Sequence, residues 1–181
     1  MAQSVTLYRF RIDLSDVDRS VYEALDFRVA QHPSESMQYL LTRVIAYALN
    51  AQEGLDFSPE GLHDPEAPAL RVQDLTGGIS LWIEIGNTNP KKLHKAAKTA
   101  KAVKVYTYKN PSDFLRECQG QNIFRADDIE VFSLDPKFLD ALGAEIQRDN
   151  RWSLLRHENA LTITQGELSF TTELHSHQIA K

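Results

Sequence analysis

Three acidic residues in separate parts of the sequence are candidates to bind one divalent metal ion. Glu35 stands at the start of a predicted helix, Asp74 ends the first arm of a predicted β-hairpin, and Glu84 lies near the end of the second arm. Carboxylates that pack together repel one another unless they are protonated, hydrogen-bonded or neutralised by a cation. Mg²⁺, or Mn²⁺ in its place, takes oxygen ligands and leaves positions for phosphate oxygens. The three acids therefore predict a Mg²⁺ site suited to phosphodiester chemistry.

Such a site also needs a cation that orients the attacking water or stabilises developing charge. The pattern Glu-x-Lys would place a lysine two residues after Glu84, where the sequence has Gly86. The following helix offers Lys92, on the flank of its apolar face, and Lys95, which projects more nearly away from that face. We expect Lys92 to supply the charge, with Lys95 as the second choice.

Each acid also has a structural explanation that needs no metal. Glu35 could interact with a helix dipole, and Asp74 could hydrogen-bond to the backbone of the adjacent Gly-Gly turn. Glu84 lies inside an apolar strand, where an acid is unfavourable unless it is paired or liganded. An ion pair between Glu84 and Arg43 or Arg71 is therefore the structural alternative to a metal.

The elements that must position these residues follow from apolar periodicity. Strands are predicted at 4–13, 20–30, 70–74, 79–85, 103–108 and 129–134, and helices at 34–53, 90–102, 111–119 and 136–147. A surface loop is expected at 54–67, a late hairpin at 152–171 and a disordered tail after Glu173. The first two strands should pair antiparallel, and strands 79–85 and 103–108 should lie parallel through a helical crossover.

Composition favours one soluble, cytoplasmic domain. The 181 residues contain no apolar run long enough to span a bilayer and begin with no secretory signal, so no membrane partner is expected. The single Cys118 excludes an internal disulfide. The net charge of −5 would repel a polyanion, so a nucleic-acid partner requires a local basic patch. That patch would consist of Lys91, Lys92, Lys95, Lys98, Lys101 and Lys104.

Several motifs together resemble the YaeQ family over nearly the whole chain. They are Leu7-Tyr8, His32-Pro33-Ser34-Glu35, Glu66, Asp74, Trp82-Ile83-Glu84-x-Gly86, Lys92-Leu93-x-Lys95-Ala96 and Val105-Tyr106. The family looks like a variant of the PD-(D/E)XK nuclease fold. The resemblance implies an α/β fold of the mixed α+β kind, with a restriction-endonuclease-like αβββαβ core and β additions at both ends, in one domain over 1–181. It also implies a Mg²⁺ site from Asp74, Glu84 and Glu35 with a displaced lysine.

Two functions fit this sequence. The first is a Mg²⁺-dependent nuclease or phosphodiesterase, with the three acids as metal ligands and Lys92 or Lys95 as the cation. The second is a catalytically silent protein of the same fold that binds a nucleic acid or a protein. Gly86, in place of the motif lysine, favours the second function.

Overall fold

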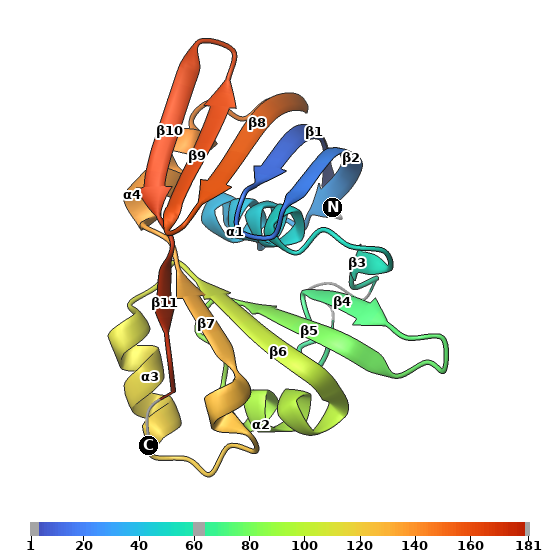
Figure 1. Cartoon of the computed structure of the whole chain (residues 1–181), viewed down its shortest axis with the longest axis vertical. Coiled ribbons are helices and arrows are strands. Elements are labelled where there is room, and N and C mark those ends of the chain that lie inside the picture. The colour runs from blue at the N-terminus through green and yellow to red at the C-terminus, as the bar shows by residue number, and fades with distance from the viewer. Residues whose placement is uncertain (1–3, 60–63, 180–181) are drawn as a thin grey trace. The chain divides into compact units, whose positions relative to one another are not determined.

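The structure is a computed structural model that describes residues 4–59 and 64–179. The described residues form two compact units, and each unit is built around its own sheet (Figure 1). Unit 1 comprises Met1–Leu49 and Leu134–Leu174, and unit 2 comprises Asn50–Ser133 and His175–Lys181. Among the described residues, no helix is both long and apolar enough to cross a membrane. The prediction of a single domain over 1–181 stays a prediction.

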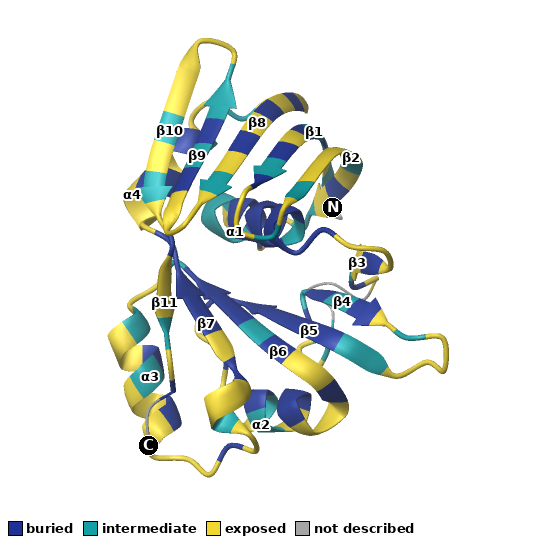
Figure 2. Ribbon diagram, viewed as in Figure 1, coloured by how far each residue is buried: buried dark blue, intermediate teal, exposed yellow. Residues whose placement is uncertain are grey.

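Unit 1 is a five-stranded mixed sheet with two helices. Its elements are β1 (Thr6–Asp16), β2 (Val21–Gln31), α1 (Met37–Leu49), α4 (Pro136–Gly143), β8 (Asp149–His157), β9 (Ala160–Gln165) and β10 (Leu168–Glu173). The strand order is β10-β9-β8-β1-β2, with β1 antiparallel to β2 and parallel to β8. Phe10, Ile12 and Leu14 alternate with more exposed residues along β1, so one face of the sheet forms the core and the other carries polar side chains (Figure 2).

Unit 2 is a six-stranded mixed sheet with two helices on one of its faces. Its elements are β3 (Leu55–Phe57), β4 (Leu70–Gln73), β5 (Ile79–Ile85), α2 (Pro90–Thr99), β6 (Ala100–Thr107), α3 (Pro111–Gln119), a 3₁₀ turn (Ala126–Asp128), β7 (Glu130–Ser133) and β11 (His175–His177). The order is β11-β7-β6-β5-β4-β3. Trp82 of β5, Leu93 of α2 and Phe114 of α3 share one buried core with Val105 of β6.

Most of the predicted elements are present. β1 and β2 pair antiparallel as expected, β4 and β5 form the predicted hairpin, and β5 and β6 lie parallel with α2 between them in the chain. Asn89 and Asn110 cap α2 and α3, and each accepts a hydrogen bond from a backbone N–H two residues later. These helices begin where a capping side chain followed by proline predicts a start.

Several expectations were wrong in detail, including the ends of the helices expected at 90–102 and 136–147, which stop at Thr99 and Gly143. The helix predicted from Ser34 begins only at Met37, because Ser36 rather than Ser34 accepts the backbone N–H of Tyr39. The predicted loop at 54–67 contains β3, and residues 60–63 lie outside the described part. The expected hairpin at 152–171 is a meander of three strands, and the expected disordered tail forms β11 against β7. Short strands at a sheet edge have little periodicity of their own, since their partners determine them.

Candidate functional site

Glu84 is the most buried acid among the described residues of unit 2, and both oxygens of its carboxylate have protein partners. It lies near the end of β5 on the same face as Trp82, two residues earlier. Glu84 Oε1 accepts the indole N–H of Trp82 at 2.7 Å and lies 3.0 Å from Lys92 Nζ. Glu84 Oε2 accepts the hydroxyl of Thr88 at 3.3 Å. Burial raises the pKa of Glu84 above its usual value, while Lys92 and the hydrogen bonds act in the opposite direction.

Lys92 is the cation that the sequence predicted near Glu84, and the structure places it there. Its ammonium also donates to the backbone carbonyl of Ala67 at 2.8 Å. One turn further along α2, Lys95 donates to Glu66 at 3.0 Å, and both of these side chains are more than half exposed. The Glu66–Lys95 and Glu84–Lys92 pairs therefore form a polar cluster one helical turn apart along α2, and the bond from Lys92 to the carbonyl of Ala67, the residue after Glu66, lies between them.

Glu66 is the residue of this cluster that sequence reasoning missed as part of the site. It stands among the family motifs, but the metal site implied by the resemblance gives it no role. The hairpin register supplies the missing signal, because Leu70 pairs with Ile83 and the N–H of Ala69 donates to the carbonyl of Ile83. The residues just before β4 must therefore lie beside Glu84.

Gly86 explains why no lysine follows Glu84 in the usual motif position. Its φ is +85°, in the left-handed region that side-chain-bearing residues rarely adopt. Its N–H donates to the carbonyl of Tyr106 at 2.8 Å, which ties the end of β5 to β6 in this conformation. A lysine there would strain the backbone, so the cation comes from α2 instead.

Asp74 belongs to the hairpin turn, at the opposite end of β5 from Glu84. Its Oδ1 accepts the Thr76 hydroxyl at 2.7 Å, the Gly78 N–H at 2.8 Å and the Thr76 N–H at 3.0 Å. Strand residues rise by about 3.3 Å each, so the stretch from Gly78 to Glu84 spans about 20 Å. The expectation that Asp74 and Glu84 would hold one ion is therefore corrected, because the turn that binds Asp74 keeps it away from Glu84.

Replacing Asp74 with alanine should destabilise the hairpin at neutral pH and leave Glu84 unaffected. The Thr76 hydroxyl, followed by the Gly78 N–H, lowers the pKa of Asp74 below its usual value of 3.8. A lowered pKa means that this carboxylate stabilises the fold above about pH 4 and that the contribution is lost as the pH falls. The Asp74→Ala variant should therefore unfold more easily than the wild type at pH 7 and differ less at pH 3. Urea titrations at both pH values measure this.

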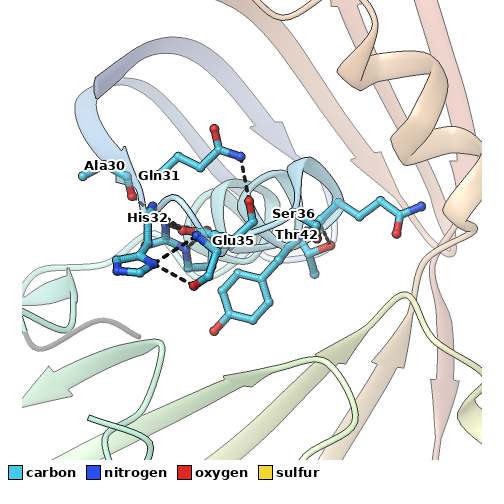
Figure 3. A network of polar contacts seen from close by, with 10 residues as sticks. Ala30, Gln31, His32, Glu35, Ser36 and Thr42 are labelled. Atoms are coloured by element: carbon cyan, nitrogen blue, oxygen red, sulfur yellow. Dashed lines mark hydrogen bonds and ion pairs between the residues drawn. The ribbon is translucent and has the colours of Figure 1, made fainter. Parts of the chain in front are cut away.

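Glu35 lies in unit 1, where it forms a buried ion pair with Arg43 of α1. Arg43 Nη2 approaches Glu35 Oε1 at 2.6 Å and Oε2 at 2.9 Å, and Arg43 Nε donates to Oε1 at 2.9 Å. Glu35 Oε2 also accepts the His32 N–H at 3.1 Å, and Gln31 donates to the Glu35 carbonyl at 3.0 Å (Figure 3). Glu35 precedes α1 rather than standing in its first turn, so its partner is Arg43 and not the helix dipole.

The protein groups present do not match an open Mg²⁺ site. Among residues 4–59 and 64–179, no three His, Cys, Asp or Glu side chains are grouped so that they could hold a metal. Glu84 and Glu35 each use both carboxylate oxygens for protein donors, and Asp74 is bound within its own turn. Mg²⁺ requires free carboxylate oxygens in near-octahedral geometry. Instead, the carboxylates of Glu35 and Glu84 are paired with the side chains of Arg43 and Lys92.

The fold and the site define a mixed α+β protein with two mixed sheets, four helices among its described residues and a buried Glu–Lys pair in the second unit. A family model described as "YaeQ protein" matches residues 1–174, and the chain belongs to this YaeQ family.

Individual relatives agree with this assignment. The chain is 28% identical over 149 residues to "Uncharacterized protein YaeQ" of Escherichia coli K12, covering 82% of each. It matches the crystal structure of the YaeQ protein from Xanthomonas axonopodis pv. citri with a TM-score of 0.88 and 29% identity, covering 97% of this chain and 99% of that one. The Pseudomonas syringae YaeQ structure has the same TM-score at 24% identity, covering 99% and 100%, and shows the fold alone.

Proposed function

We propose that this protein is a cytoplasmic, nuclease-fold relative that binds nucleic acid through unit 2 and does not hydrolyse it. The observation that carries the proposal is that the Glu84 carboxylate is paired with Lys92 and accepts hydrogen bonds from Trp82 and Thr88. A hydrolytic site must present its acid to a metal and a phosphate, whereas this acid is buried and both of its oxygens already accept hydrogen bonds from protein groups.

The connections of unit 2 support descent from the PD-(D/E)XK fold. Strands β3, β4 and β5 form an antiparallel meander, and α2 then leads to β6, which lies parallel to β5. Together with α1, this gives the order α-β-β-β-α-β along the chain. The order is that of the core implied by the YaeQ resemblance. On this proposal, Gly86 and the Glu84–Lys92 ion pair occupy the position that a catalytic centre would have in that fold.

The outer face of α2 offers the basic surface that nucleic-acid binding requires. Lys91, Lys95 and Lys98 are exposed and recur at helical spacing, opposite the buried Leu93, Ala96 and Ala97. Lys101 follows at the start of β6 and is 76% exposed. The pairs Lys95–Glu66 and Lys101–Asp74 are exposed surface pairs of the weak kind, so phosphates can compete for these lysines.

The absence of hydrolysis is tested with Glu84→Gln, which keeps the shape of the side chain. The wild type and Glu84→Gln are each titrated calorimetrically with Mg²⁺ and Mn²⁺ and then incubated with single-stranded and duplex DNA and RNA. The two proteins should give the same result. We expect neither saturable metal binding nor cleavage. Saturable binding and cleavage that both disappear in Glu84→Gln would overturn the proposal.

Nucleic-acid binding is tested by fluorescence anisotropy at several salt concentrations. Lys98→Gln should weaken binding and make the plot of log affinity against log salt shallower, by about 0.7 for a single strand or about 0.9 for a duplex if this lysine neutralises one phosphate. Lys137→Gln removes the same charge from α4 of unit 1 and is the matched control. Equal weakening in the two variants, or no binding by the wild type, would contradict an interface on α2.

Mg²⁺-dependent phosphodiester hydrolysis is the second candidate, and it is favoured by the position of the Glu66–Lys95 pair one helical turn from the Glu84–Lys92 pair. In that case Lys92 and Lys95 would release the two carboxylates to an ion, and Glu66 would take the role predicted for Asp74. The Glu66→Gln variant distinguishes the two functions. Loss of metal-dependent cleavage in Glu66→Gln and Glu84→Gln alike supports the enzyme, while unchanged nucleic-acid binding without cleavage supports the binding protein.

A further inference from the structure

The polar face of the unit 1 sheet contains a concavity of about 400 Å³. Small-molecule sites have volumes of about 300–1,000 Å³, so the concavity is large enough for a small metabolite. It extends over β2, β1, β8 and β9, and the alternating exposed bands of β1 and β8 in Figure 2 mark the strands that form its centre. Its lining residues include Arg11, Asp13, Asp26, Arg151, Ser153 and Thr164.

Two arginines stand side by side at one end of this concavity. Arg11 and Arg151 are register partners on the parallel strands β1 and β8, so their side chains leave the same face of the sheet. Like charges in this arrangement repel, and the fold must therefore supply a counter-charge or leave the position open to an anion. Asp149 pairs with Arg11 at 2.6 Å, but Arg151 has no hydrogen bond or ion pair within the described chain.

The neighbouring acids do not neutralise Arg151. Asp26, on β2, is held by Arg9 through two hydrogen bonds of 2.9 and 2.7 Å. Arg11 retains a buried Nε–H that has no partner among the described residues. An anion placed beside Arg151 would thus meet an unpaired guanidinium, with the positive charge of Arg11 next to it.

The neighbouring register position on the same sheet face carries an acid and two hydroxyl side chains rather than arginines. Asp13 is the register partner of Ser153, and Ser153 pairs in turn with Thr164 of β9. Asp13 is exposed and has no hydrogen bond or ion pair within the described chain. Asp13, with Ser153 and Thr164 following it in the same row, can accept hydrogen bonds from hydroxyl or amino groups of a ligand.

We propose that this concavity binds a small phosphate monoester, with its phosphate between Arg11 and Arg151 and its hydroxyl or amino groups against Asp13, Ser153 and Thr164. A phosphate monoester carries a charge near −2 at neutral pH and offers three acceptor oxygens, which suits two guanidinium groups better than a single carboxylate does. A free nucleotide, a sugar phosphate and the 5′-phosphorylated end of a nucleic acid share this chemistry.

The experiment titrates the full chain with adenosine 5′-monophosphate, ribose 5-phosphate and a 5′-phosphorylated dinucleotide, each beside its unphosphorylated counterpart. Backbone amide signals in ¹H–¹⁵N spectra identify the location, and calorimetry gives the dissociation constants. We expect saturable binding of at least one phosphorylated probe, weakened by removal of the phosphate, with shifts at residues 11–13, 151–153 and 164. The probe that binds most tightly identifies the source of the phosphate.

Two variants that each remove one positive charge distinguish specific binding in the concavity from general electrostatic attraction to the sheet face. Arg151→Gln should weaken binding about tenfold or more, because it removes a charge-assisted contact. Arg28→Gln removes an exposed arginine from the same sheet face but outside the concavity, and it should have little effect. With inorganic phosphate added as a further probe, Asp13→Asn should reduce the preference for ribose 5-phosphate over inorganic phosphate. Absence of saturable binding, or equal weakening in Arg151→Gln and Arg28→Gln, would overturn the proposal.

Discussion

Replacing Lys92 with methionine is expected to lower the free energy of unfolding by about 3–5 kcal/mol at pH 7, the cost of leaving one member of a buried ion pair without its partner. Methionine keeps most of the aliphatic volume of the lysine but removes the charge that faces Glu84. The carboxylate would retain only its hydrogen bonds from Trp82 and Thr88. Urea unfolding followed by tryptophan fluorescence measures the change.

The pH dependence separates this electrostatic cost from a packing defect. Burial already raises the pKa of Glu84 above its usual 4.5, and loss of Lys92 removes the largest opposing influence. A carboxyl whose pKa is raised on folding destabilises the fold as the pH rises through that pKa, and the cost disappears below the unfolded value. The loss of unfolding free energy in Lys92→Met should therefore be smaller at pH 4 than at pH 7. It should also be smaller in the double variant Lys92→Met/Glu84→Gln.

The exposed neighbour Lys91 supplies the control for this prediction. Lys91→Met makes the same change on the outer face of α2 and should alter stability by no more than about 0.5 kcal/mol. A deficit in Lys92→Met that stays constant with pH would show that packing, and not the charge of Glu84, dominates at this position.

Local signals in the sequence were sufficient for most elements, because capping residues and periodicity act over a few positions. Asn89 followed by Pro90 predicted the start of α2 correctly, and the Gly77–Gly78 turn predicted the β4–β5 hairpin. The edge strands β3 and β11 were missed, since their stability comes from β4 and β7 rather than from their own residues.

Of the candidate site, the pairing of Lys92 with Glu84 was predicted from the sequence, whereas the grouping of Asp74 with Glu84 was not correct. Proximity of Lys92 to Glu84 follows from a short connection between β5 and α2, which the sequence displays directly. The grouping of Asp74 with Glu84 required knowledge of the hairpin register. In an antiparallel hairpin, the residue beside the turn is the one furthest from the end of the second strand, so Asp74 could not reach Glu84. The acid on the Glu84 side of the hairpin is Glu66, which precedes β4 and pairs with Lys95.

Replacing Arg43 with methionine is expected to cost about 3–5 kcal/mol of stability, because it leaves Glu35 buried without its cation. The side chains of Arg43 and Glu35 are only 9% and 1% exposed, so water cannot take the place of the lost partner. Burial raises the pKa of Glu35 above 4.5, with Arg43 as the strongest opposing influence. The deficit should therefore be largest at neutral pH, decline as the pH falls toward 4.5 and be largely gone below that value.

This variant also tests whether Glu35 can act as a metal ligand. If Glu35 contributed to a Mg²⁺ site, removing Arg43 would free its carboxylate to bind the ion. Added Mg²⁺ would then stabilise the folded state by RT ln(1 + [Mg²⁺]/Kd). We expect the midpoint of unfolding of Arg43→Met to be the same with and without millimolar Mg²⁺, because Glu35 belongs to no group of three or more His, Cys, Asp or Glu side chains that could hold a metal ion among the described residues. Arg28→Met, an exposed change in the same unit, controls for the loss of a positive charge. A Mg²⁺-dependent recovery of stability in Arg43→Met alone would restore Glu35 as a candidate metal ligand.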